Sequence, residues 1–183
     1  MKLIRDVLAA DAHICDALES KKRIIAPTSL HPFLASIRAA ERPLLIVTSS
    51  SRGAEDLAND LGELHGRVLE FPAWETLPHE RLSPSSDTVG RRMAVLRRLA
   101  HPKEIAPIKV LVTSARAFIQ PIVAGLGDVP VLKISTGDDF SLEKLVTELS
   151  RLGFDRVDLV DRRGQFAVRG GIVDLFPPAL EHP

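Results

Sequence analysis

The turn from Ala26 to Pro32 stands where a nucleotide-binding α/β protein carries its phosphate site, between a first apolar run and a first long helical pattern. Such a site needs backbone N–H donors, glycines that allow close approach and a lysine that reaches the terminal phosphate. This turn has no glycine and no lysine, and Pro27 and Pro32 remove backbone donors. The sequence therefore predicts that ATP is not bound here.

Other catalytic patterns are also missing from the sequence. It has no G-x-S-x-G elbow, and its six histidines form neither an H-E-x-x-H pattern nor a metal-ligand cluster. Ser49, Ser50 and Ser51 follow the second predicted strand, where serines cap the next helix more often than they bind anions. We predict a chain with no catalytic residues, no metal and no cofactor of its own.

Arginines are concentrated after a proline-punctuated loop, residues 71–88, which holds the only tryptophan, Trp74. Between Arg81 and Lys103 there are six basic residues and one acidic residue, Asp87. Four of the basic residues lie on one predicted helix: Arg91, Arg92, Arg97 and Arg98. They form either a solvated helix face or a patch for a phosphate backbone or a protein, and the pattern leaves both open.

A second group of arginines lies in a predicted hairpin over residues 156–176. Strand alternation places Phe166 and Val168 on one face and Ala167 and Arg169 on the other. Arginines beside an aromatic side chain are typical of protein-binding hot spots. The pattern is equally compatible with arginines that pair across the hairpin with three aspartates: Asp155, Asp158 and Asp161.

The elements that must position these residues alternate between strand and helix in the first part of the chain. The predicted strands cover residues 23–26, 43–48, 67–71 and 108–113. The predicted helices cover residues 3–18, 30–40, 53–64 and 88–100. This alternation indicates a parallel sheet with crossover helices.

The pattern changes after residues 125–128. We expect a strand at 129–134, a helix at 141–152 capped by Ser141, and the hairpin, with a turn at 162–164 and a bulge at Gly170 and Gly171. Two domains follow from this pattern: an α/β domain over residues 1–128 and a small α+β domain over residues 129–183.

Composition limits the class of protein. The 183 residues are 45% hydrophobic, with 24 basic and 24 acidic residues, so a sizeable core forms without the basic excess of a nonspecific nucleic-acid binder. The lone Cys15 excludes a disulfide framework, and no leader or long apolar run is present. We expect a cytoplasmic protein with no membrane contact.

Two stretches carry a family resemblance: F-P-A-W-E-T-L-P-H-E-R-L-S-P from Phe71, and F-A-V-R-G-G-I-V-D-L-F-P from Phe166. They resemble the N-terminal, UvrB-like module of the bacterial transcription-repair coupling factors (Mfd). The resemblance implies a helicase-like parallel sheet with a degenerate P-loop, like UvrB domain 1a, followed by a small α+β domain like UvrB domain 2. It also implies an excised N-terminal piece of a longer protein.

The same resemblance implies that the small domain binds UvrA. Arg156 and Arg169 match arginines that UvrB-like domains use for UvrA, and Phe166 fits the F-x-V-R pattern. Ala167 departs from the F-R-V-R pattern of UvrB, so a basic contact is missing and Arg163 is the candidate replacement. The chain also lacks the tyrosines that UvrB places around its DNA-inserting hairpin.

Three functions are therefore open. The first is a non-catalytic adaptor that recruits UvrA in transcription-coupled nucleotide excision repair, with ATP used by motor domains of the parent protein, and with RNA polymerase and DNA contacted through that parent. The second is a UvrB-like DNA- or nucleotide-binding module that uses the basic helix. The third is a structural role in bracing or masking the remaining domains of the parent.

Overall fold

The computed structural model describes residues 2–20, 23–66, 68–76, 83–103, 105–129 and 131–177. By their contacts, the residues form two compact units. Unit 1 consists of Met1–Trp74 and His101–Ile122, and unit 2 of Glu75–Ala100 and Val123–Pro183. The fold class is mixed α/β, as predicted, with one three-stranded sheet in each unit.

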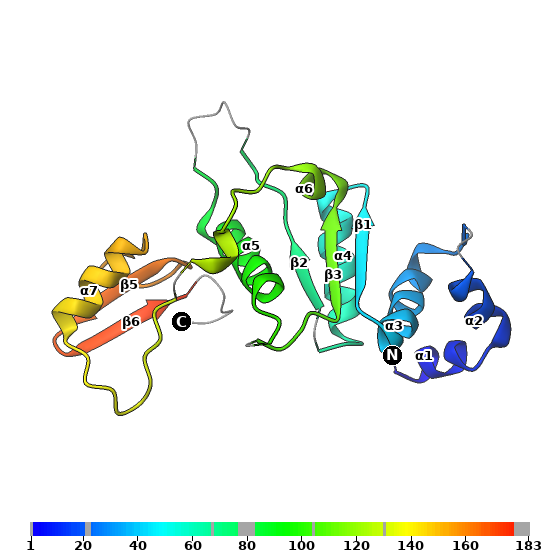
Figure 1. Cartoon of the computed structure of the whole chain (residues 1–183), viewed down its shortest axis with the longest axis horizontal. Coiled ribbons are helices and arrows are strands. Elements are labelled where there is room, and N and C mark those ends of the chain that lie inside the picture. The colour runs from blue at the N-terminus through cyan, green and yellow to red at the C-terminus, as the bar shows by residue number, and fades with distance from the viewer. Residues whose placement is uncertain are drawn as a thin grey trace. The chain divides into compact units, whose positions relative to one another are not determined.

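Unit 1 is built on a parallel sheet in the order β1-β3-β2, from β1 (Leu44–Thr48), β2 (Val68–Phe71) and β3 (Val110–Ser114). Helix α4 (Ser51–Gly62) joins β1 to β2, as Figure 1 shows. It begins where Ser50 Oγ accepts the N–H of Gly53 at 3.1 Å, which confirms the predicted capping serine. Helix α3 (His31–Glu41), which has a proline in its first turn, precedes β1.

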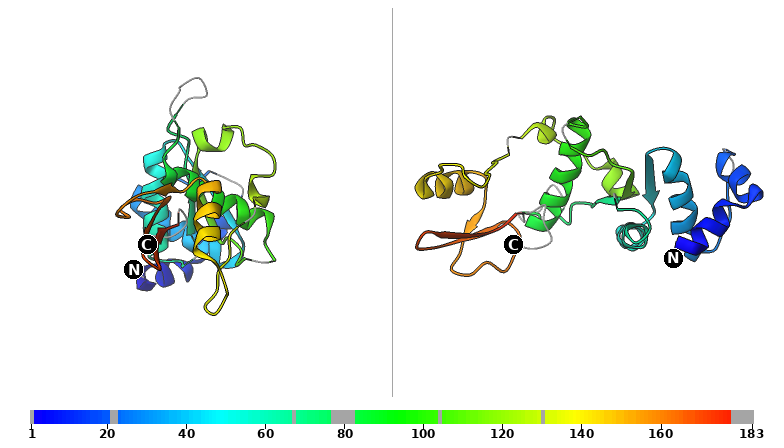
Figure 2. Two further views of the ribbon diagram at one scale, coloured as in Figure 1. Left: turned by 90° about the vertical axis from the view of Figure 1, so that its left-hand side faces the viewer. Right: turned by 90° about the horizontal axis from the view of Figure 1, so that it is seen from below.

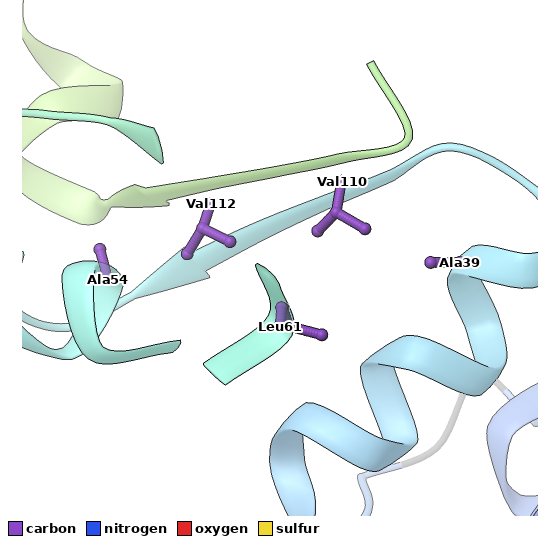
Figure 3. Close-up of a cluster of buried hydrophobic side chains, with 5 residues drawn as sticks. All are labelled: Ala39, Ala54, Leu61, Val110 and Val112. Atoms are coloured by element: carbon purple, nitrogen blue, oxygen red, sulfur yellow. The ribbon is translucent and has the colours of Figure 1, made fainter. Parts of the chain in front are cut away.

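The core of unit 1 lies between the sheet and helices α3 and α4. Ala39 from α3, Ala54 and Leu61 from α4, and Val110 and Val112 from β3 form one buried cluster (Figure 3). Small alanines on the helices let the backbones approach the β-branched side chains of the central strand. Helix α6 (Ala115–Ile119) then begins at Ser114, whose Oγ accepts the N–H of Ala117 at 3.2 Å.

The beginning of the chain differs from the prediction. One helix was expected over residues 3–18, but α1 (Lys2–Ala9) and α2 (Ala12–Glu19) are separate, because the Asp11 carboxylate accepts the N–H groups of His13 and Ile14 and starts a new helix. The strand expected at residues 23–26 is absent, and residues 23–27 lead without regular structure into a 3-10 turn, η1 (Thr28–Leu30).

Unit 2 combines helices with a second three-stranded sheet, in the order β4-β5-β6. Helix α5 (Ser86–Ala100) contacts the 3-10 turn η2 (Leu126–Asp128), and α7 (Leu142–Arg151) starts at Ser141, whose Oγ accepts the N–H of Lys144 at 3.1 Å. Strand β5 (Gln165–Arg169) lies between the short parallel β4 (Asp155–Arg156) and the antiparallel β6 (Ile172–Phe176).

The hairpin turn is not where the sequence predicted it. Gly170 and Gly171 are the two turn residues between β5 and β6, rather than a bulge. The ribbons of the two strands lie side by side in Figure 2. Gly170 has φ 60°, a conformation that two-residue hairpin turns of type II′ require at their first position. The predicted turn at 162–164 precedes β5, and residues 131–134 of the expected strand at 129–134 have no strand structure.

The two units divide the chain differently from the predicted boundary at residue 128. Helix α5 was assigned by pattern to the first domain, whereas its contacts place it in unit 2. Gly127 of η2 lies so close to α5 that an added Cβ would come within 2.8 Å of the Leu96 carbonyl oxygen, which explains the small residue there. This grouping brings α5 and the strand segments into one compact unit.

Candidate functional site

The start of helix α5 carries a small hydrogen-bonded cluster. Glu75 Oε1 accepts the hydroxyl of Ser85 at 2.6 Å and that of Thr88 at 2.5 Å. Ser85 Oγ in turn accepts the N–H of Thr88 at 3.3 Å. Burial opposes the ionisation of Glu75, but the hydrogen bonds from Ser85 and Thr88 outweigh it, so the pKa of Glu75 lies below its usual value. The carboxylate therefore ties Glu75 to the residues at the start of α5.

Replacing Glu75 by glutamine is expected to lower stability near neutral pH and to have little effect in acid. Because the folded state lowers this pKa, the ionised carboxylate stabilises the fold above the unfolded value of about 4.3, and that contribution is lost as pH falls through the folded value. Thermal unfolding of both proteins at pH 7 and pH 3 measures this. An equally large difference at pH 3 would contradict it.

Asp87, the second residue of α5, forms ion pairs with two arginines. Arg91 Nε lies 2.9 Å from Asp87 Oδ2, one helical turn away, and Arg163 from the segment before β5 donates to Asp87 Oδ1. The Arg163 guanidinium also lies over the Phe176 ring, 5.5 Å from its centroid. These contacts hold the segment before β5 against the start of α5.

The backbone at Gly164 strengthens this attachment. Gly164 donates its N–H to Phe176 O at 2.8 Å, and its own carbonyl accepts the N–H of Asp155 at 2.9 Å. Gly164 has φ 82°, and a Cβ at this position would lie 3.1 Å from Ser86 Cβ and Oγ. The left-handed conformation favours glycine, and a Cβ would also force Ser86 to move.

An open hollow of about 600 Å³ lies at this junction, which we call the α5 hollow. Its lining comes from the start of α5, the segment before β5 and the end of β6: Pro84, Ser85, Ser86, Asp87, Asp155, Asp161, Arg162, Arg163, Gln165 and Phe176. Sequence reasoning did not single out Asp87, Arg162 or Gln165 as functional, and it assigned Asp87 with α5 to the other domain.

The four residues predicted to bind UvrA have different environments. Arg156 is exposed on β4, and the Arg169 side chain is 62% exposed at the end of β5. Arg163 is 26% exposed and engaged by Asp87. Phe166, in contrast, has 0% exposed surface. The structure therefore makes Phe166 a core residue of unit 2 rather than a surface contact.

Among the described residues, the arginine pairs differ from the predicted pairing with Asp155, Asp158 and Asp161 across the hairpin. Arg169 Nη2 lies 2.5 Å from Asp174 on β6, and Arg163 pairs with Asp87, which are not the predicted partners. Arg162 Nε lies 3.8 Å from Asp161, but the two are neighbours in sequence and their contact does not cross the hairpin. A hairpin turn at Gly170 and Gly171 puts Asp174 opposite Ala167, and so diagonal to Arg169 on the same face of the sheet, which would have revealed this pair.

The four arginines of α5 are not presented together. Arg92 is 1% exposed, and burial lowers the pKa of its guanidinium. Arg91 pairs with Asp87, and Arg97 Nη1 donates to Val129 O at 3.2 Å. Arg98 is half-buried. Because Arg92 faces the interior, it cannot reach a phosphate backbone in this conformation, and the helix offers a weaker basic patch than its sequence indicates.

Comparison with known proteins gives a family match within the last part of the chain. The family model described as "UvrB interaction domain" matches residues 132–183. This range contains α7, β4, β5 and β6, and with them Arg156, Arg162, Arg163 and Arg169. No helix among the described residues is long and apolar enough to cross a membrane.

Relatives extend the match to most of the chain. A transcription-repair-coupling factor of Mycobacterium tuberculosis (strain CDC 1551 / Oshkosh) is 49% identical over 164 residues, which are 87% of this chain and 13% of the relative. The factor of Myxococcus xanthus is 28% identical over 94% of this chain, and that of Escherichia coli (strain K12) is 28% identical over 77%. This chain belongs to the transcription-repair-coupling factor family, which confirms the predicted resemblance, and it spans 13% of the mycobacterial relative.

Proposed function

We propose that this chain is a non-catalytic adaptor whose unit 2 binds UvrA and so recruits it in transcription-coupled nucleotide excision repair. The single observation that carries the proposal is the match of residues 132–183 to the UvrB interaction domain, in a unit that exposes Arg156 and Arg169 on its sheet. UvrA is the partner that the family resemblance implies for these arginines.

The absence of catalysis in this chain is part of the same proposal. The segment from Ala26 to Pro32 contains η1 and the start of α3. Its two prolines, Pro27 and Pro32, lack the backbone N–H groups that a phosphate site needs as hydrogen-bond donors. We propose that ATP is used, and RNA polymerase and DNA are contacted, by other parts of the longer family members. The burial of Arg92 argues against the alternative in which α5 itself binds DNA.

Replacing Arg169 by alanine is expected to weaken UvrA binding about fivefold or more, because truncating a hot-spot arginine typically costs more than ~1 kcal/mol. The melting temperature should change little, since its pair with Asp174 is exposed. Isothermal titration of purified UvrA into the wild-type chain and the Arg169→Ala variant measures the loss.

Arg52→Ala is the matched control for this experiment. Arg52 lies on α4 in unit 1, its side chain is 90% exposed, and its contact with Asp56 is 3.9 Å long. Removing it deletes one exposed positive charge without touching unit 2. The proposed function is contradicted if Arg169→Ala and Arg156→Ala both bind UvrA as tightly as Arg52→Ala does.

A further inference from the structure

Two adjacent arginines before β5 have opposite environments. The Arg163 side chain is 26% exposed, pairs with Asp87 and lies over Phe176. The Arg162 side chain is 81% exposed, and its Nε is 3.8 Å from the exposed carboxylate of its neighbour Asp161. The sequence alone favoured Arg163 as the replacement for the arginine missing at position 167. The structure separates the two residues by what each one contacts.

The backbone around Arg162 is fixed from both sides. Gln165 Oε1 accepts the N–H of Asp161 at 3.1 Å and that of Arg162 at 2.9 Å. Gln165 donates its own N–H to Arg162 O at 3.3 Å. The next residues, Arg163 and Gly164, are attached to the start of α5. Arg162 is thus an exposed guanidinium on an ordered turn at the rim of the α5 hollow.

The free energy needed to break its present contacts decides which of the two arginines is available to a partner. Withdrawing Arg163 would break its ion pair with Asp87 and its contact with the Phe176 ring. Withdrawing Arg162 from Asp161 costs little, because an exposed ion pair at 3.8 Å contributes almost nothing to stability. A fixed backbone also reduces the ordering cost that binding would otherwise carry.

We infer that Arg162 is a further partner-contact residue, which donates to a carboxylate of the docked protein, and that Arg163 with Asp87 is the anchor that positions it. The inference rests on the proposed function, because it adds a contact to the UvrA-binding surface that Arg156 and Arg169 are proposed to form. The planar guanidinium of Arg162 is suited to a carboxylate through two parallel N–H donors, which a lysine cannot offer.

Titration of UvrA into the full chain, combined with thermal unfolding, tests the two roles. Arg162→Ala is expected to weaken binding about five- to tenfold with an unchanged melting temperature. Arg162→Lys should recover only part of the affinity. Arg163→Ala should lower the melting temperature and the affinity together, and Asp87→Asn should do the same, because either change releases the anchor.

Different outcomes of this titration contradict the role of Arg162, the role of Arg163 and the proposed function. If Arg162→Ala binds like Arg52→Ala while Arg169→Ala binds weakly, the contact role of Arg162 is wrong and the proposed function stands. If Arg163→Ala weakens binding without any change in melting temperature, Arg163 is the contact and the inferred division of roles is wrong. If none of the arginine variants of unit 2 affects binding, the proposed function itself fails.

Discussion

Replacing Phe166 by alanine is expected to lower the free energy of unfolding of unit 2 by about 3–5 kcal/mol, the range for removing a buried aromatic side chain. Phe166 has 0% exposed surface and lies in the central strand, opposite Arg156 on β4 and Leu175 on β6. A cavity at this position would affect both neighbouring strands. Urea unfolding followed by circular dichroism measures the loss.

Ile172→Ala provides the matched control, because Ile172 is in the same hairpin but 66% exposed. Its removal should change stability by only about 0.5 kcal/mol. UvrA binding by Phe166→Ala should fall in proportion to the unfolded fraction and recover when the temperature is lowered. A variant that stays fully folded but binds weakly would show that Phe166 acts at the surface after all.

The strands of unit 1 could be predicted from the sequence because their residue types favour extended, buried strands. Leu-Leu-Ile-Val-Thr in β1 and Val-Leu-Val-Thr-Ser in β3 are short β-rich runs bounded by polar or turn residues, and both became neighbours in a parallel sheet. The serine caps at Ser50 and Ser141 were equally local, since a side chain that reaches three residues forward needs no tertiary contact.

Other features depended on contacts that no local pattern contains. Ile24 and Ile25 look like a strand, yet both are exposed and residues 23–27 form none. Asp87 and Arg163 are 76 residues apart in sequence, so their pairing follows only from α5 joining unit 2. The alternation of β5 marked a face for Phe166 but could not show that β4 and β6 would flank it on both sides.

The arginines proposed to bind UvrA could likewise not be ranked from the sequence alone. Family resemblance identified the segment, because F-A-V-R-G-G is specific, but it could not rank the arginines within it. Their ranking depends on side-chain partners: Asp87 for Arg163, Asp174 for Arg169, and only a distant Asp161 for Arg162. Exposure and pairing therefore add a physical criterion that a motif does not contain.

Replacing Gly164 by alanine is expected to destabilise unit 2 by roughly 2 kcal/mol or more. A left-handed backbone costs a residue with a Cβ about 1–2 kcal/mol, and forced contact in a packed site adds to it. Gly164 has φ 82°, and the new Cβ would lie 3.1 Å from Ser86 Cβ and Oγ. Its N–H and carbonyl are both hydrogen-bonded, to Phe176 and Asp155, so the backbone cannot relax without breaking them.

Gly170→Ala separates the two causes of this destabilisation. Gly170 also has a positive φ, 60°, but no heavy atom lies within 4 Å of a Cβ built there, so its substitution should show the conformational cost without the steric one. The larger loss in Gly164→Ala, measured by thermal unfolding, then reports the contact with α5. Ser86→Gly should restore part of that difference in Gly164→Ala and none of it in Gly170→Ala. Equal losses in the two alanine variants would mean that the segment before β5 is not held against α5, and the anchored position of Arg162 would lose its physical basis.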